Sequence, residues 1–219
     1  MAEVKLWADK DLNLINSSVQ TANNGNLTLR AGHDLTLDNS YVSHTNGQAT
    51  NFWADHDMAI QNQSHVVLSN NTGNSDFLAG HDFNLTAMSS IQDFSSTDLR
   101  ISADHNVTMD HARIGKDGGN LLMYAGHDLT LSHAGIRLTN GGDLNLIAEK
   151  DITLDKAAVK ALHSGDINFT AGHDITILNY SLVLNRDGGD INLTAGNDVY
   201  IDPTSTVTAN PGNVNINDP

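Results

Sequence analysis

One short motif, Ala-Gly-His-Asp or a close variant followed by alternating apolar residues, returns every 22 to 25 residues along this chain. Its copies begin at Ala8, Ala31, Ala54, Ala79, Ala103, Ala125, Ala148, Ala171 and Ala195. A fixed period of this length marks a solenoid, in which each repeat is one structural unit stacked on its neighbours. We therefore interpret residues 1–219 as a single continuous unit. Both ends interrupt a repeat, so we expect an excised segment of a longer protein.

Each repeat contains three short stretches with strand character. In 25–46, apolar residues alternate with polar ones through Leu27 and Leu29, and again through Leu35 and Leu37. Alternation with period two is typical of short strands that bury one face. The third stretch is less regular, and its predicted inward residues are Val19, Val42, Val67, Ile91, Ile114, Ile136, Val159, Leu182 and Val207. Three strands per coil predict an all-β, right-handed parallel β-helix of about nine coils, because parallel crossover connections are right-handed.

Glycine opens most of the repeats and predicts the geometry of one turn. These glycines are Gly25, Gly47, Gly73, Gly119, Gly142, Gly165, Gly189 and Gly212. Because glycine lacks a Cβ atom, we predict a positive φ at these positions. The Thr97-Asp98 junction lacks this glycine, so we expect a local irregularity in the coil 98–118.

The charge of the chain excludes two classes of partner. Its net charge is -15, with only 11 lysines and arginines, and no basic cluster interrupts the acidic background. Nucleic acids and anionic membrane surfaces bind basic surfaces, so neither is a predicted partner.

A column of histidines occupies equivalent turn positions: His33, His56, His81, His105 and His127, with His173 further along. Consecutive imidazoles about 5 Å apart could chelate a transition metal. However, Lys10, Lys150 and Asn197 occupy the same column, and lysine repels a cation. We therefore interpret the column as a solvent-exposed corner and predict neither a bound metal nor a cofactor. The five histidines are the metal candidates that the sequence offers.

The aspartates that follow these histidines form a second column. Stacked carboxylates could bind calcium, but the Gly-Gly-x-Gly-x-Asp spacing of calcium-binding β-helices is absent. We predict instead that each carboxylate accepts hydrogen bonds from the backbone of its own turn, a role that Asn106 can also fill.

An outward position just before each repeated alanine carries large apolar residues. Its candidate binding residues are Trp7, Trp53, Leu78, Tyr124 and Ile147. Both tryptophans of the chain lie in this one column. An exposed apolar and aromatic stripe marks an interaction surface, and aromatic faces suit sugar rings or a protein partner. A local bulge that turned these side chains inward would remove the surface.

The repeats GNLTLRAGHDLTL (25–37), GNLLMYAGHDLTL (119–131), GDLNLIAEKDITL (142–154) and GDINFTAGHDITI (165–177) resemble those of filamentous haemagglutinin. Related large exoproteins of Gram-negative bacteria, secreted by the two-partner route, share them, as do contact-dependent growth inhibition stalks. The resemblance covers nearly the whole chain. It implies a β-helical part of a long fibre, secreted or on the bacterial cell surface, and an outer-membrane secretion partner for the parent protein.

Three functions follow in order of expectation. The first is a rigid stalk segment of an adhesin or contact-dependent inhibition protein, which presents distal domains and catalyses nothing. The second is a carbohydrate- or receptor-binding module that uses the aromatic stripe. The third is a polysaccharide-cleaving β-helix enzyme, for which coils of such uniform length leave little room for active-site loops. Uncapped strand edges at the two ends further predict end-to-end self-association.

Overall fold

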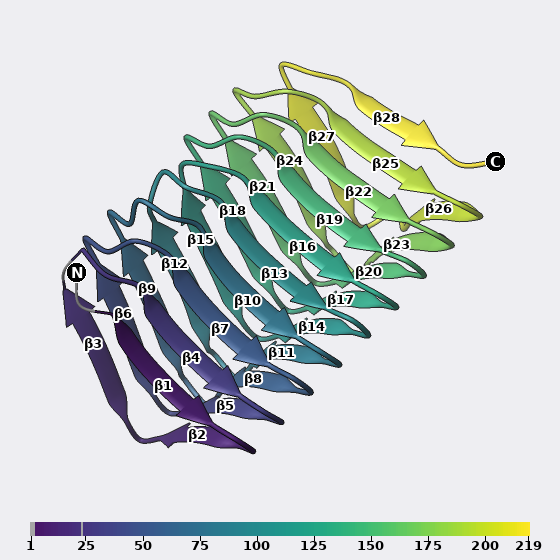
Figure 1. Ribbon diagram of the computed structural model, residues 1–219. Helices are drawn as coiled ribbons and strands as arrows, with labels where there is room; N and C mark the ends of the chain where they lie inside the picture. Colours follow the sequence, from purple (N-terminus) through teal and green to yellow (C-terminus); the bar gives the residue numbers. More distant parts are fainter. Residues whose placement is uncertain (1–2, 23) are drawn as a thin grey trace.

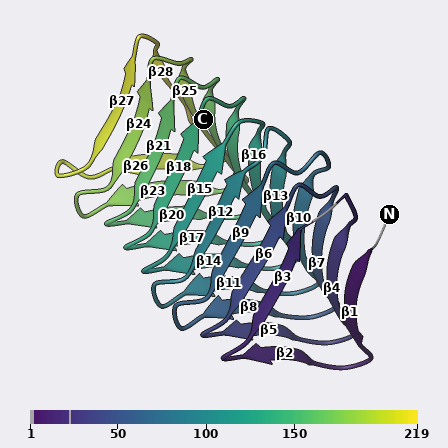
Figure 2. The same cartoon turned by 90° about the vertical axis from the view of Figure 1, so that its left-hand side faces the viewer.

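The computed structural model describes residues 3–22 and 24–219 as a solenoid of 28 strands (Figure 1). Three parallel sheets run along the solenoid, and each coil contributes one strand to each sheet (Figures 1 and 2). The part of the chain that the structure describes contains no helix, and so no helix able to span a membrane. This is the predicted right-handed parallel β-helix with three strands per coil.

The strands of the three sheets are short and evenly spaced. Sheet A consists of β1 (Val4–Ala8), β4 (Leu27–Ala31), β7 (Thr50–Ala54), β10 (Ser75–Ala79), β13 (Leu99–Ala103), β16 (Leu121–Ala125), β19 (Leu144–Ala148), β22 (Ile167–Ala171), β25 (Ile191–Ala195) and β28 (Val214–Asn217). Sheet B consists of β2 (Leu12–Ile15), β5 (Leu35–Asp38), β8 (Met58–Gln61), β11 (Phe83–Thr86), β14 (Val107–Asp110), β17 (Leu129–Ser132), β20 (Ile152–Asp155), β23 (Asp174–Leu178) and β26 (Asp198–Ile201). Sheet C consists of β3 (Ser18–Ala22), β6 (Tyr41–Thr45), β9 (His65–Ser69), β12 (Ser90–Phe94), β15 (Arg113–Asp117), β18 (Gly135–Thr139), β21 (Ala158–Leu162), β24 (Leu182–Arg186) and β27 (Thr206–Asn210).

The core runs through every coil without interruption. The alternating leucines of the repeat 25–46 are fully buried, as predicted, and so are their equivalents in the next six coils. Three phenylalanines pack together within the core: the Phe52 and Phe77 ring centroids lie 4.6 Å apart, and Phe77 meets Phe83 edge-on at 6.5 Å. Inward residues of the terminal strands, such as Leu6 in β1 and Ile201 in β26, are only partly buried, because only one side of each strand is covered.

The predicted register of the third strand is wrong in two coils. Val66 and Val183 are buried, whereas the predicted residues Val67 and Leu182 point outward. In both coils two apolar residues are adjacent, so alternation alone cannot say which one is inside. A small residue two positions earlier sets the register. This column of small side chains at the start of sheet C is Ser40, Ser64, Ser89, Ala112, Ala134, Ala157 and Ser181.

The glycine prediction is confirmed at Gly119 and Gly212 and is wrong at the other predicted positions. In most coils the residue with positive φ precedes the predicted glycine. Asparagine often fills this position, as at Asn46, one residue before Gly47, and at Asn140, two residues before Gly142. At the predicted positions themselves glycine provides space, since a Cβ atom on Gly142 would lie 1.9 Å from the Asn120 Oδ1 atom. The irregularity predicted for 98–118 is absent from sheet A, where all five residues of β13 pair with both neighbouring strands.

Candidate functional site

The Ala-Gly-His-Asp motif forms the corner between sheet A and sheet B. Its alanine is the last residue of the sheet A strand and is buried, as Ala31 and Ala54 illustrate. The backbone ladder continues around this corner, because the His56 N–H donates to the carbonyl of His33 at 3.0 Å and the His81 N–H to that of His56 at 2.9 Å. The histidines are therefore held in register by main-chain bonds, one per coil.

Glycine and acidic residues alternate at the second position of this corner. The order is Asp9, Gly32, Asp55, Gly80, Asp104, Gly126, Glu149, Gly172 and then Gly196. A Cβ atom on Gly80 would lie 2.2 Å from the carbonyl oxygen of Asp55, and Gly32 is placed in the same way over Asp9. The glycine is thus needed because a main-chain carbonyl oxygen of the preceding coil lies against it, and a Cβ atom on Gly196 would have the same contact, at 2.1 Å, with Gly172.

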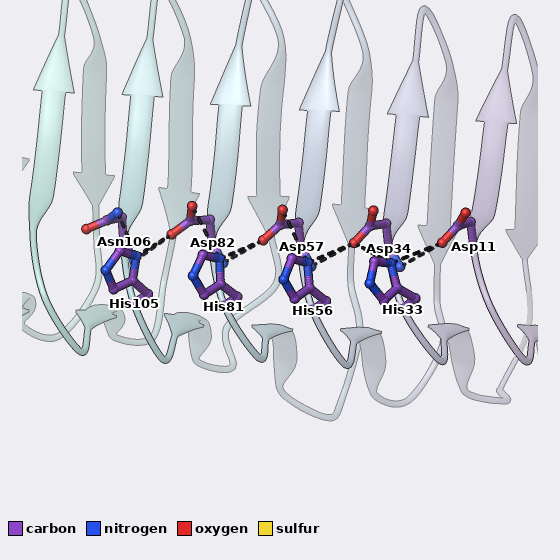
Figure 3. A network of polar contacts seen from close by, with 9 residues as sticks. All are labelled: Asp11, His33, Asp34, His56, Asp57, His81, Asp82, His105 and Asn106. Carbon is purple, nitrogen blue, oxygen red and sulfur yellow. Dashed lines mark hydrogen bonds and ion pairs between the residues drawn. The ribbon is translucent and has the colours of Figure 1, made fainter.

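The five histidines that follow form one stack of nearly parallel rings. The ring centroids of His33 and His56 are 4.7 Å apart, those of His56 and His81 are 4.9 Å apart, and those of His81 and His105 are 4.7 Å apart. His127 extends the row at 5.1 Å from His105. We call these five residues the imidazole row. Figure 3 shows its first four rings in line, each with one nitrogen against the aspartate carboxylates.

Within the imidazole row, the rings of His56 and His81 each lie between two carboxylates. The Nδ1 atom of His56 is 3.2 Å from an oxygen of Asp34 in the preceding coil and 3.3 Å from an oxygen of Asp57 in its own coil. His81 has the same arrangement, with its Nδ1 atom 3.1 Å from Asp57 and 3.5 Å from Asp82. The structure therefore combines the two columns into one alternating network of histidine and aspartate.

The aspartates also carry backbone bonds between coils. The Oδ1 atom of Asp34 accepts the N–H of Asp57 at 3.1 Å, and Asp57 accepts the N–H of Asp82 at 3.0 Å. The predicted acceptor role is right, but the predicted donor is wrong, because it belongs to the next coil and not to the same turn. Asn106 fills this role as predicted, accepting the N–H of Asp128 at 3.2 Å.

These contacts change the acidity of the carboxylates. Partial burial acts to raise the pKa of Asp34, but the Asp57 N–H and the His56 ring outweigh it and hold this pKa below the ordinary value of 3.8. The pKa of Asp82 is lowered against burial in the same way, by the Asn106 N–H and the His105 ring. Both carboxylates are therefore ionised at neutral pH, and the row is lined by negative charge.

The predicted binding stripe points outward, as expected from the sequence. Trp7, Trp53, Leu78, Tyr124 and Ile147 all lie in one register column of sheet A. The tryptophans are the most exposed, at 61% for Trp7 and 45% for Trp53, and the other three are half-buried.

Arg30 lies between the two tryptophans in the stripe. Its guanidinium carbon is 5.0 Å from the centroid of the Trp53 ring, and it pairs with Asp55 at 3.7 Å. Arg30 and Asp55, with Lys5, Trp7 and Asp9, line a shallow hollow at the start of sheet A. Whether this surface binds anything remains a prediction.

Sequence reasoning missed a column of buried polar residues in sheet C. At the fourth position of its strands stand His44, Asp93, Lys116 and Asn185, all at most 2% exposed. They satisfy the backbone of the turn to sheet A: His44 reaches the Gly25 carbonyl at 3.1 Å, and Lys116 donates to the Ser95 carbonyl. The signal was their position, two residues after the buried apolar residue of the same strand.

Compared with models of protein families, with curated proteins and with solved structures, this chain matches none of them.

Proposed function

We propose that the chain is a rigid stalk segment of a large secreted or cell-surface protein, of the filamentous haemagglutinin type that its repeats resemble. The single observation that carries the proposal is the unbroken stack of strands in all three sheets, enclosing one continuous core. Ten strands in sheet A, about 4.8 Å apart, span roughly 43 Å. A body of this shape holds whatever is attached at its far end at a fixed distance.

The uniformity of the coils supports a spacing role. Consecutive strands are joined by only two to five residues throughout the described chain. Catalytic and binding residues are most often presented on longer loops that a rigid scaffold positions. We therefore propose a non-catalytic segment, with the polysaccharide-cleaving enzyme as the least favoured function.

The proposed parent is an adhesin or a contact-dependent inhibition protein. It would leave the cell through an outer-membrane secretion partner and carry its functional domain beyond this segment. The net charge of -15 supports a role in an extended fibre, because like charges keep neighbouring fibres apart.

A second candidate function is recognition of a glycan or a cell-surface receptor by the stripe. The observation that favours it is the exposure of two tryptophans on one face, with the Arg30 guanidinium over one of them. Planar aromatic faces of this kind pack against sugar rings or protein side chains.

One experiment separates the two functions. The labelled chain is added to intact bacterial and host cells alongside a Trp7→Ala, Trp53→Ala variant whose circular dichroism matches the parent. A stalk segment binds neither cell type saturably, whereas saturable binding that the variant loses would assign recognition to the stripe.

The rigidity itself is measured with two spin labels. Cysteines replacing Lys5 in β1 and Asn215 in β28, which share one register column, place labels nine strand spacings apart. A narrow distance distribution near 43 Å supports the stalk, and a broad one contradicts it.

A further inference from the structure

The stacked imidazoles have a second nitrogen that the fold leaves unused. The Nδ1 atoms of His33, His56 and His81 face carboxylates. No hydrogen bond or ion pair among the described residues uses the Nε2 atoms of these three histidines. The side chains of His56 and His81 are 44% exposed. The Nε2 atoms are therefore accessible to a ligand from solvent.

The aspartates determine which nitrogen carries the proton. A carboxylate accepts hydrogen bonds and repels a lone pair, so the neutral rings of His56 and His81 keep their proton on Nδ1. This leaves a lone pair on each Nε2. A carboxylate bonded to the far nitrogen is also the usual support of a metal-binding histidine, because it orients the ring and raises its basicity.

The structural role of this column does not need an imidazole. In a later coil Asn197 occupies the same position and donates from Nδ2 to Asp174 at 2.7 Å, as the histidine rings do to their aspartates. Lys150 serves in another coil, pairing with Asp151 at 3.0 Å and with Asp128 at 3.8 Å. What only histidine adds is the outward lone pair, and five consecutive coils carry it.

We propose that neighbouring Nε2 atoms of the imidazole row, centred on His33, His56 and His81, bind divalent transition-metal ions such as Zn²⁺. Imidazole is a preferred ligand of this class of ion. Each ion would bridge the Nε2 atoms of two adjacent coils at the outer edge of the rings, with water completing its coordination. The ligand is thus a pair of histidines one coil apart.

A shared ion requires two neighbouring rings to tilt toward each other. Parallel rings 4.7 Å apart hold equivalent nitrogens at a similar distance. In a tetrahedral site with Zn–N bonds of about 2.0 to 2.1 Å, the two ligand nitrogens lie about 3.3 Å apart. Each Nε2 must therefore move by about 0.7 Å, and the two rings must tilt so that their lone pairs converge on the ion, a rearrangement open to these partly exposed side chains.

The charges around the row favour a cation, contrary to the expectation from the sequence. Lysine occurs only beyond the two ends of the row, at Lys10 and Lys150, and Lys150 is already paired with two aspartates. Within the row, the carboxylates of Asp34, Asp57 and Asp82 lie beside the rings. The negative surface raises the local concentration of divalent ions.

Two variants with equal histidine content test the proposal. His56→Asn with His105→Asn leaves three histidines of the row but no adjacent pair, whereas His33→Asn with His127→Asn leaves the contiguous set of three. All proteins carry His111→Asn, which removes a separate stacked pair with His133, at a residue whose φ of 51° asparagine accepts. Asparagine occurs naturally in the row's own column, so both variants should retain the parent circular dichroism.

The probe is Zn²⁺ alone, titrated by calorimetry near pH 7.5. We expect the variant with the contiguous set to keep the parent affinity with fewer ions bound, and the variant without pairs to lose at least about tenfold in affinity. Equal binding by the two variants, or a parent that binds no tighter than the variant without pairs, would overturn the proposal.

Nitrogen-15 spectra of the parent rings give a test that needs no variant. Zn²⁺ should shift the Nε2 signals of His56 and His81 at concentrations that leave His173 unchanged, since its column neighbours are Lys150 and Asn197. A shift at Nδ1 instead, or an equal response of His173, would contradict binding by paired Nε2 atoms.

Discussion

The charges of Asp93 and Lys116 form a buried ion pair that should be strongly coupled, so that losing both costs no more than losing one. Lys116 Nζ lies 3.4 Å from Asp93 Oδ2, and neither side chain has any exposed surface. At this distance, an effective dielectric constant of about 20 gives an attraction of about 5 kcal/mol. Burial nevertheless raises the pKa of Asp93 and lowers that of Lys116, because the removal of each charge from water opposes their mutual attraction.

Breaking the pair from either side should therefore leave an uncompensated charge in the core. We expect Lys116→Met and Asp93→Asn each to lower the free energy of unfolding by about 3 to 5 kcal/mol. The double variant should lower the free energy of unfolding only about as much as one single variant. The reason is that the coupling energy between the two charges is about as large as the effect of one single substitution. Arg113→Met, which removes an exposed charge from the same strand, is the control and should change stability by less than about 0.5 kcal/mol.

The assay is guanidinium chloride denaturation, joined by hydrogen exchange of the peptides that cover β12 and β15. Exchange is needed because a solenoid can unfold in parts, and a global midpoint then averages over coils. If the two single effects add to the double effect within about 0.5 kcal/mol, the pair is not coupled and the electrostatic reasoning is refuted.

Three further perturbations test other parts of the structure. Phe77→Ala, at a fully buried ring between Phe52 and Phe83, should cost about 3 to 5 kcal/mol in denaturation experiments, and a loss below about 1 kcal/mol would contradict the continuous core. Gly80→Ala places a Cβ atom 2.2 Å from the Asp55 carbonyl oxygen and should cost about 1 to 3 kcal/mol, whereas a neutral result would show that the corner relaxes freely. Burial lowers the pKa of His44 below its ordinary value of 6.5, despite the opposing bond to the Gly25 carbonyl. Because the unfolded chain then binds the proton more readily than the folded one, the stability from the neutral ring is present above pH 6.5 and is lost as the pH falls below it. His44→Leu should remove this part of the pH dependence of the denaturation midpoint, and an unchanged dependence would exclude His44 as its source.

The sequence predicts most of this fold because the apolar period and the turn motif agree in every coil. The registers of sheets A and B follow from the position of each strand relative to the Ala-Gly-His-Asp motif, even where apolar residues are adjacent, as in Leu121–Ala125. The register of sheet C does not, because pairs such as Val66 and Val67 leave two registers open until the preceding buried serine is recognised.

The candidate sites were predicted less completely than the fold. The histidine column and the outward tryptophans follow from the repeat alone, but the pairing of each Nδ1 with two carboxylates depends on how one coil lies over the next. Buried His44 and Lys116 were hidden by their polar character, which suggests the surface. Their role is to satisfy turn carbonyls, and only the three-dimensional turn reveals that need.

From Asp9 to Glu149, the alternation of glycine and acidic residues at the corner makes two coils, and not one, the unit in which the solenoid can change length. Successive acidic residues are separated by a full pair of coils, from Asp9 to Asp55 and from Asp55 to Asp104. Removing the single coil that carries Gly32, Gly80 or Gly126 would put two acidic side chains in adjacent coils, about 4.8 Å apart. Removing or duplicating a pair keeps the order intact. Variants of different length should therefore be built in steps of two coils, each step changing the span by about 9.6 Å.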